Sequence, residues 1–291
     1  MKHRCRPALL FAFVLGLSSA SASTSINAVN YQAYGANMGW LNARGDVTGG
    51  AVLGQFYSWG YIWGANVGWI SMGSGTPANG WQYSNAASGD WGVNHDGVGN
   101  LRGMAYGANI GWINFEDTGD PQVDLLTGNL SGYAYGANVG WISLSNSQAF
   151  VQTDFLDAGP DSDGDGIPDA WEFKMVGDLT TLGPYPDDAD GDGYPDIFEY
   201  WADTHPTNPA SFLAITEMER EDTTNTVTWT VQPTRLYRLE EAESVTNNAV
   251  WVDAGFGLIE PGAGPTLTRD VVQTNDTPRF YRSRAVVPLA P

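Results

Sequence analysis

The chain has 291 residues, with 33 acidic against 13 basic side chains and a formal net charge of −20. Only two cations, Arg44 and Arg102, lie between residues 24 and 150. This balance excludes a surface that follows nucleic-acid phosphates and disfavours an anionic lipid surface as a partner. It leaves cations, or neutral partners such as sugars. A chain of this length favours two or three domains over one.

The first 22 residues have the pattern of a signal peptide. Three basic residues precede an apolar stretch over 8–17, and small residues follow at 20–22. The apolar stretch is about half the ~20 residues that a membrane-spanning helix needs. We therefore expect a mature protein without a transmembrane segment, secreted to the extracellular space or the cell surface. Cys5 is the only cysteine, so core packing, repeats or bound metal must stabilise the mature chain.

Residues 23–153 are repetitive. The sequence AYGANMGWLN at 33–42 returns with small changes at 62–71, 105–114 and 134–143, at intervals of 29, 43 and 29 residues. A fixed period indicates one supersecondary unit in several copies. Each copy reads as a short strand, a turn over Gly-Ala-Asn and a second strand with period-two alternation. The repeats therefore predict an all-β domain without helices, and both a solenoid and a closed sheet fit this period.

Aromatic side chains occupy equivalent positions in every repeat. Such positions usually stack on one another, so we expect them to form the shared core. The alternative is a sugar-binding face, in which rings stack on pyranoses, neighbouring Asn side chains bond hydroxyls, and several weak copies give avidity. We expect Asn37, Asn66, Asn109 and Asn138 to make turns rather than to bind ligand. The candidate ligand-binding residues are Tyr34, Trp40, Trp63, Trp69, Tyr106, Trp112, Tyr135 and Trp141.

Residues 154–210 carry the most specific motif, DSDGDGIPDAWE, which returns as DADGDGYPDIFE. Carboxylates fall at positions 1, 3, 5, 9 and 12 with Gly at position 6, the spacing by which an EF-hand-like loop wraps Ca²⁺; position 7 offers its backbone carbonyl. Crowded carboxylates need a counter-ion, and oxygen ligands without His or Cys favour calcium. We expect about two Ca²⁺ ions, held by Asp161, Asp163, Asp165, Ile167, Asp169 and Glu172, and by Asp188, Asp190, Asp192, Tyr194, Asp196 and Glu199. A solvated acidic linker is the alternative.

Three resemblances accompany these patterns. Residues 160–212 resemble the thrombospondin type 3 repeats that precede a C-terminal β-domain in secreted bacterial proteins, which implies calcium loops that stiffen a domain junction. The repeats over 30–145 resemble GWI-type aromatic units of exported bacterial proteins, a resemblance that implies no established activity. Residues 212–287 are similar, more loosely, to the C-terminal domain that follows such calcium repeats.

Residues 211–291 predict a small β-sandwich, because six short strand-like runs alternate with turn residues. The tail from Pro288 is expected to fray. The runs lie at 212–216, 226–231, 236–242, 249–254, 266–272 and 279–287.

Catalysis has little support in the sequence, and no catalytic residue is assigned. A glycosidase needs two carboxylates at one cleft, whereas the acidic side chains of the repeats lie in turn-like settings that solvated loop charges explain. We predict a secreted calcium-binding modular protein for adhesion or polysaccharide binding. The alternatives are a structural envelope or matrix component without a discrete ligand, and a carbohydrate-active hydrolase or lyase. The acidic residues of the repeats are Asp46, Asp90, Asp96, Glu116, Asp117, Asp120 and Asp124.

Overall fold

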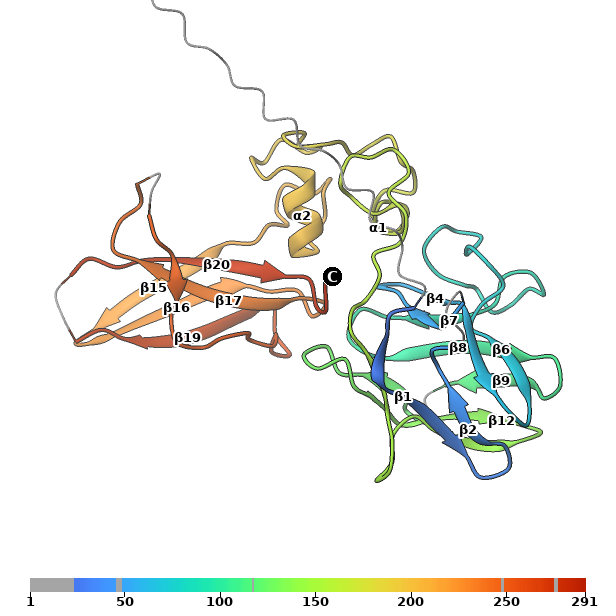
Figure 1. Ribbon diagram of the computed structural model, residues 1–291. Helices are drawn as coiled ribbons and strands as arrows, with labels where there is room; N and C mark the ends of the chain where they lie inside the picture. Colours follow the sequence, from blue (N-terminus) through green and yellow to red (C-terminus); the bar gives the residue numbers. More distant parts are fainter. Residues whose placement is uncertain (1–23, 46–48, 117, 247–248, 275–276) are drawn as a thin grey trace, which may run out of the picture.

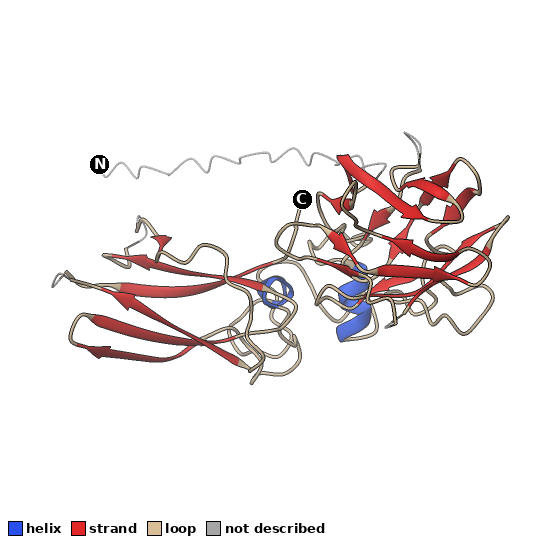
Figure 2. Ribbon diagram, turned by 90° about the horizontal axis from the view of Figure 1, so that it is seen from below, coloured by secondary structure: helices blue, strands red, loops and turns tan. Residues whose placement is uncertain are grey.

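The protein is mainly β, as predicted, with a larger and a smaller β part and two short helices near their junction (Figures 1 and 2). A computed structural model describes residues 24–45, 49–116, 118–246, 249–274 and 277–291. The signal peptide predicted over 1–22 lies outside these residues.

The aromatic repeats form a closed barrel of eight antiparallel strands. Each repeat is one hairpin, each hairpin pairs with the next, and β13 of the last hairpin pairs with β1 of the first. This pairing decides between the solenoid and the closed sheet in favour of the closed sheet, which removes unpaired edges. The hairpin strands are β1 (Ile26–Gly35), β2 (Gly39–Asn42), β5 (Tyr61–Gly64), β6 (Gly68–Ser71), β8 (Leu101–Gly107), β9 (Gly111–Phe115), β12 (Tyr133–Gly136) and β13 (Gly140–Ser143).

The barrel interior is filled by one aliphatic pair from each hairpin. Across the first hairpin Ala33 faces Leu41, and the other three repeat this arrangement. An eight-stranded barrel is just wide enough for such side chains to fill it. The corresponding pairs are Ile62 with Ile70, Ala105 with Ile113, and Ala134 with Ile142.

The expectation that the repeated aromatics form the core is wrong. All eight are between 37 % and 47 % exposed and stand on the outer face of the barrel. Successive residues of a strand point to opposite faces, and the aliphatic neighbour of each aromatic already occupies the interior. The strands alternate with period two as predicted, but the buried residues are the aliphatic ones and not the aromatic ones.

The turns over Gly-Ala-Asn require glycine because their residues pack closely at one end of the barrel. In the first hairpin the N–H of Met38 donates to the carbonyl of Gly35 at 3.1 Å, and Met38 is buried. A Cβ on Gly35 would lie 2.6 Å from the Met38 side chain, and Gly39 has φ +81°. Both glycines are therefore required, one for space and one for its left-handed backbone.

The turn asparagines link the hairpins in a ring. The side-chain amide of Asn66 donates to the carbonyl of Met38 in the preceding hairpin at 3.0 Å. Asn109 and Asn138 repeat this bond one hairpin further on, and Asn37 closes the circle. The expectation of a turn role is therefore extended, because each Asn also bridges two turns. The other three bonds run from Asn109 to Val67 at 3.0 Å, from Asn138 to Ile110 at 3.0 Å and from Asn37 to Val139 at 3.1 Å.

Short strands extend the larger part beyond the eight-stranded ring. β7 pairs with β8, and β14 pairs with β1, while the other short strands form two-stranded pairs. Within the segment 121–126, β10 covers two residues. These elements are β3 (Val52–Leu53), β4 (Ser58–Trp59), β7 (Val93–His95), β10 (Gln122–Val123), β11 (Leu130–Ser131) and β14 (Val151–Thr153).

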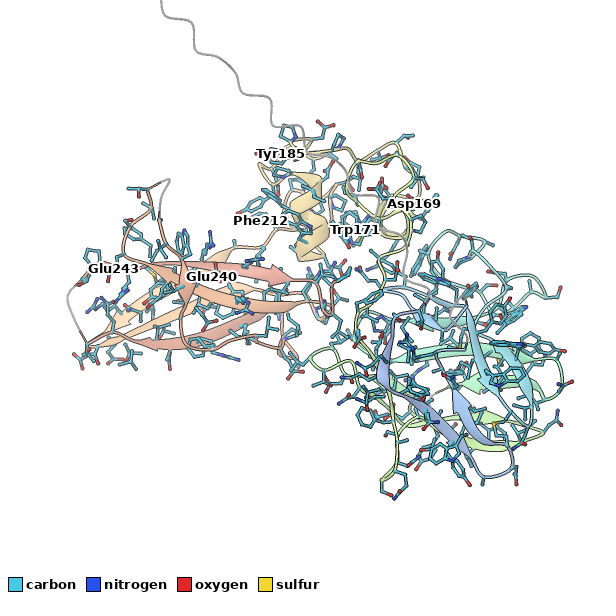
Figure 3. The ribbon with its side chains drawn as sticks, in the orientation of Figure 1. Asp169, Trp171, Tyr185, Phe212, Glu240 and Glu243 are labelled. Atoms are coloured by element: carbon cyan, nitrogen blue, oxygen red, sulfur yellow. The ribbon has the colours of Figure 1, made fainter. Side chains whose placement is uncertain are left out.

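The acidic segment folds into two loops, each followed by a helix, α1 (Asp169–Met175) and α2 (Asp196–Ala202). Pro168 and Pro195 stand at the N-caps of these helices, one residue before the first helical position. Trp171 of α1, which is labelled in Figure 3, belongs to an apolar cluster that both helices share. It meets Tyr200 of α2 edge to face at 5.6 Å. No helix within the described residues is long and apolar enough to span a bilayer.

The C-terminal part consists of two three-stranded antiparallel sheets packed over one core, which is the predicted small sandwich. Trp229, Tyr237 and Leu239 are its largest buried side chains. The first strand begins three residues later than expected. The strands are β15 (Ile215–Glu221), β16 (Thr224–Thr230), β17 (Leu236–Ala242), β18 (Val252–Asp253), β19 (Thr266–Val272) and β20 (Phe280–Val286).

The C-terminal tail is tied to the larger part, contrary to the expectation that it frays. The N–H of Leu156 donates to the carbonyl of Leu289 at 2.8 Å, and the Leu289 side chain packs against the barrel's apolar cluster. The chain therefore returns from the sandwich to the residues that leave the barrel.

Candidate functional site

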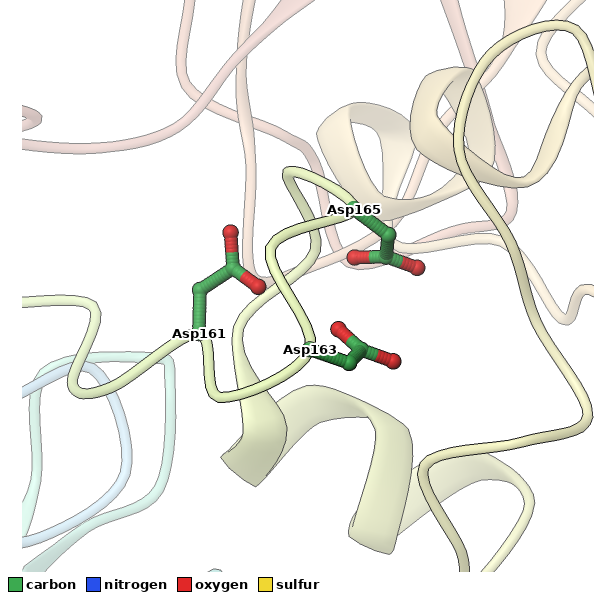
Figure 4. Close-up of side chains that lie close together, drawn as sticks. All are labelled: Asp161, Asp163 and Asp165. Carbon is green, nitrogen blue, oxygen red and sulfur yellow. The ribbon is translucent and has the colours of Figure 1, made fainter. Parts of the chain in front are cut away.

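The first acidic loop brings three carboxylates together. Asp161, Asp163 and Asp165 each place an oxygen within 4.8 Å of the others, and they turn toward a common space (Figure 4). The loop is held by its own backbone, since Asp161 accepts the N–H groups of Gly164 and Gly166 at 2.8 and 3.0 Å. Gly166 has φ +98°, which a side chain would strain. The predicted loop spacing therefore brings the three carboxylates into one cluster.

The second loop repeats this geometry. Asp188, Asp190 and Asp192 form an equivalent group within 4.8 Å. Asp188 accepts N–H groups from Gly191 and Gly193, both at 2.8 Å. Two loops from separate stretches of sequence thus adopt one conformation.

A glutamate at position 12 of each loop is buried behind the aspartates. Glu172 is 0 % exposed, and neither of its carboxylate oxygens has a hydrogen-bond partner among the described residues. Burial, followed by the charges of Asp165 and Asp163, raises the pKa of Glu172 to about 8. Glu199 is equally buried and its pKa is also raised to about 8, first by burial, although Thr204 donates to one of its oxygens at 3.1 Å.

The buried carboxylate oxygens that lack a hydrogen bond show whether these residues suit a cation. A buried carboxylate without a hydrogen bond is costly, and a cation would remove that cost at every one of these atoms. The ligand types are all oxygens, which hard cations such as Ca²⁺ and Mg²⁺ prefer. These residues therefore fit a hard metal ion. The unpartnered buried oxygens belong to Asp165, Glu172, Asp190, Asp192 and Glu199.

The aspartates at position 9 lie differently from the other predicted ligands. Asp169 accepts the N–H and the hydroxyl of Ser162 at 2.7 and 2.5 Å. Asp196 accepts the N–H groups of Ala189 and Gly183 at 3.0 and 3.2 Å. Each joins the helix start to the loop backbone, a placement consistent with the position that often reaches calcium through water.

At position 7 the predicted ligand is a backbone carbonyl, so the side chains are free for packing. Ile167 is buried in the cluster shared by α1 and α2. Tyr194 stacks on Phe212 with ring centroids 5.2 Å apart. Both residues anchor their loops to neighbouring structure.

The outer face of the barrel carries four matched aromatic pairs. In each hairpin a Tyr or Trp on the first strand lies directly opposite a Trp on the second. The ring centroids lie 4.8–4.9 Å apart with the planes tilted by 56–59°. The pairs are Tyr34 with Trp40, Trp63 with Trp69, Tyr106 with Trp112 and Tyr135 with Trp141, the eight candidates named from the sequence.

The strand register adds a polar residue to every pair. On the strand of the preceding hairpin, an Asn or Ser lies directly opposite the Tyr or Trp, so each pair becomes a row across three strands. Neighbouring strands are about 4.8 Å apart, so a row spans ~10 Å. We call these four sets the polar-aromatic rows: Asn42–Trp63–Trp69, Ser71–Tyr106–Trp112, Asn114–Tyr135–Trp141 and Ser143–Tyr34–Trp40.

The row of Asn114, Tyr135 and Trp141 borders a hollow of about 210 Å³, which Glu116 and the turn at 118–119 also line. That turn is held in place, because the N–H of Tyr133 donates to the carbonyl of Gly119 at 2.7 Å. A Cβ on Gly119 would lie 1.9 Å from the Tyr133 carbonyl oxygen and 3.1 Å from the Trp141 ring. The hollow therefore has a fixed wall beside an exposed indole.

A second hollow, of about 310 Å³, lies where the barrel, the helices and the sandwich meet. Its titratable groups are occupied. Both ring nitrogens of buried His95 contact backbone groups, at 3.0 and 3.1 Å, and burial lowers its pKa. Asp96 accepts three hydrogen bonds from residues 98–100, and Asp203 pairs with Lys174 at 3.5 Å. This hollow lies at a junction, and the described residues that line it include no free acid–base pair.

A third hollow, of about 710 Å³, lies between α2 and β20. Phe198 and Trp201 line it and stack at 5.3 Å. Arg282 and Arg284 form its other side, but both lie near Glu240, at 2.6 and 4.0 Å. The hollow is mostly apolar, and its two arginines share Glu240 as an ion-pair partner.

The sequence analysis did not identify three more aromatic residues that contact the pairs, or the Asn and Ser residues that begin the polar-aromatic rows. Tyr61, Trp91 and Tyr133 each pack edge to face on a Trp of a pair, at 5.1–6.2 Å. Tyr61 and Tyr133 lie two residues before paired aromatics, so the alternation could have identified them. The proximity of Asn114 and Glu116 to Trp141 could not be predicted from the sequence, because it depends on which hairpins pair.

Comparison of the chain with protein-family models, with curated proteins and with solved structures found no match.

Proposed function

We propose that this is a secreted, non-catalytic protein that binds polysaccharide through the outer face of its barrel and holds two Ca²⁺ ions in its acidic loops. The observation that carries the proposal is the set of four exposed aromatic pairs, repeated with the same geometry in each hairpin.

Exposed rings in this arrangement are costly unless they bind something. A buried aromatic side chain contributes several times the transfer free energy of a methylene group, yet these rings stay at the surface. Exposed apolar patches of this kind mark interaction sites. Pyranose rings present apolar C–H faces to aromatic rings, and amide or hydroxyl groups beside the rings suit sugar hydroxyls. Four weak sites on one polymer would give avidity.

Calcium in the loops is supported by the two equivalent carboxylate groups and by the buried glutamates that have unpartnered oxygens. Size and ligand number favour Ca²⁺ over Mg²⁺, which keeps more of its waters. The resemblance to thrombospondin type 3 repeats points the same way. When bound, the ions would supply positive charge to the loops, and the loops' own role is to present α1 and α2 in fixed positions.

Binding rather than hydrolysis is favoured by the lining of the hollow beside Trp141. Hydrolysis of a glycosidic bond uses two carboxyl groups on opposite sides of the scissile bond. Among the described residues that line this hollow, Glu116 is the one carboxylate.

Affinity electrophoresis through gels that contain polysaccharides tests the binding proposal. The mature protein should be retarded by at least one polymer. The double variant Trp69→Ala with Trp112→Ala should raise the apparent Kd at least tenfold, since interface aromatics commonly contribute more than ~1 kcal/mol each. Trp251→Ala, in the sandwich, is the control and should leave retardation unchanged. A folded wild-type protein that no polysaccharide retards would support a structural role without a ligand.

Titration calorimetry tests the calcium proposal. The wild-type protein should bind about two Ca²⁺ ions, and Asp163→Ala or Asp190→Ala should each remove or weaken one site. Asp178→Ala is the control, because Asp178 is an exposed aspartate that accepts hydrogen bonds from Thr180 and Thr181 outside both loops. Unchanged stoichiometry and affinity in both loop variants would contradict the proposal.

A further inference from the structure

We infer that the row of Asn114, Tyr135 and Trp141 is the primary subsite of the barrel, and that it selects sugar units without an anionic group. This inference rests on the proposed polysaccharide binding and adds to it a location and a ligand class. The observations are an uncommitted amide, a hollow of suitable size and the charge at its rim.

Asn114 differs from the polar residues of the other three rows, because they are hydrogen-bonded to the backbone that follows them. Asn42 accepts the N–H of Arg44, and the hydroxyls of Ser71 and Ser143 donate to the carbonyls of Gly73 and Ser145. By contrast, Oδ1 of Asn114 is buried and has no hydrogen-bond partner within the described part of the chain. The oxygen that lacks a partner can accept a sugar hydroxyl once the Asn114 side chain turns it toward the hollow that Asn114 lines.

The hollow beside Trp141 suits one sugar unit. Its volume of about 210 Å³ lies below the ~300–1,000 Å³ of pockets that enclose a drug-sized ligand. The three residues of the row line it together with Glu116, Thr118 and Gly119. An open, ring-lined hollow of this size receives one residue of a chain whose neighbours continue over the other rows.

Charge decides the ligand class. Among the described residues that line the hollow, Glu116 is the charged one, and it is exposed. The two barrel arginines are engaged elsewhere: Arg44 donates to the carbonyl of Ile26, and Arg102 donates to the carbonyl of Leu101 and lies 3.9 Å from Asp120. A uronate or sulfate group would meet a carboxylate without a compensating cation, whereas a neutral unit offers hydroxyl or amide donors to Glu116.

Matched polymers test the selectivity. We would compare retardation by neutral polysaccharides and by anionic derivatives of the same backbones, such as hydroxyethyl cellulose and carboxymethyl cellulose. The neutral member of a bound pair should bind at least tenfold more tightly at low salt, and the difference should shrink as salt screens the charges. Glu116→Lys should reduce this difference, while Glu219→Lys, the same change on exposed β15, should leave it intact.

Matched tryptophans test the location. Trp141 and Trp40 are 46 % and 44 % exposed and occupy equivalent places in two rows. Trp141→Ala should weaken binding at least threefold more than Trp40→Ala, and equal losses would overturn the assignment of a primary subsite. Equal binding of neutral and anionic polymers, or identical behaviour of the two lysine variants, would overturn the selectivity while polysaccharide binding stands. Failure of every polymer to bind would instead overturn the proposed function.

Discussion

Glu172 combines full burial with a carboxylate that no neighbour satisfies. Its pKa of about 8 in the metal-free chain lies well above the usual 4.5. The folded state therefore disfavours the ionised form. The resulting destabilisation is absent below about pH 4.5 and grows as the pH rises toward 8.

This pH dependence of stability predicts the behaviour of the metal-free protein. In chelator, Glu172→Gln should be more stable than wild type at pH 8, and its advantage should shrink as the pH falls to 5. His95 and the other titrating groups are common to both proteins, so the difference in thermal melting isolates Glu172. In calcium the order should reverse, because glutamine offers one neutral oxygen in place of a carboxylate that can bind Ca²⁺ with two. Parallel stability profiles of the two metal-free proteins would show that Glu172 is not held as described.

At the scale of elements, the barrel depends on contacts between hairpins as much as within them. Strands of four residues make few ladder bonds, and the ring of Asn-to-carbonyl bonds joins each turn to the next. The ring also explains why the interval of 43 residues does not disturb the barrel. The inserted segment lies between two hairpins, and the bond from Asn109 to Val67 still forms across it.

Asn109→Ala should therefore destabilise the barrel by about 1–3 kcal/mol, because the Val67 carbonyl loses its donor in a partly buried setting. Denaturant melting followed by tryptophan fluorescence measures the change. Gln148→Ala, at an exposed loop position, should stay within about 0.5 kcal/mol. If Asn109→Ala instead lowered polysaccharide affinity at unchanged stability, the amide would be a ligand group and the ring an incidental contact.

At the scale of the whole molecule, Asp203 connects three parts of the chain. It ends α2, accepts the indole N–H of Trp171 on α1 at 2.7 Å and lies 3.8 Å from Arg235 of the sandwich. The charges of Arg235 and Lys174 lower the pKa of Asp203 despite the opposing effect of its burial. From the same helix Tyr200 donates to Gln55 of the larger part at 3.3 Å.

Asp203→Ala should loosen this junction, because buried Arg235 would lose its charged partner, at a cost on the order of 3 kcal/mol. Limited proteolysis should then cut between the two β parts sooner, and denaturant melting should separate into two transitions. Asp253→Ala is the control, since Asp253 and its partner Arg238 are both about one-third exposed. Unchanged cleavage rates in Asp203→Ala would mean that the two parts are joined by other contacts.

The sequence alone determined the features that depend on local spacing. The repeat period gave four copies of one hairpin, the Gly-Ala-Asn turns followed from backbone chemistry, and the Asp and Gly spacing predicted two loops that gather carboxylates. The alternating runs after residue 211 gave the small sandwich. Each of these is fixed by residues a few positions apart, so no distant contact was needed to identify it.

Only the tertiary structure decided which half of the alternation faces inward. A period of two separates residues such as Trp141 and Ile142 onto opposite faces, but it does not say which face is the core. Closure of the barrel settles this, because its narrow interior takes Ile142 and its equivalents and leaves the larger indoles outside. Closure also sets Asn114 opposite Tyr135 and brings Glu116 to the same hollow, since their proximity depends on pairing between hairpins rather than on spacing along the chain.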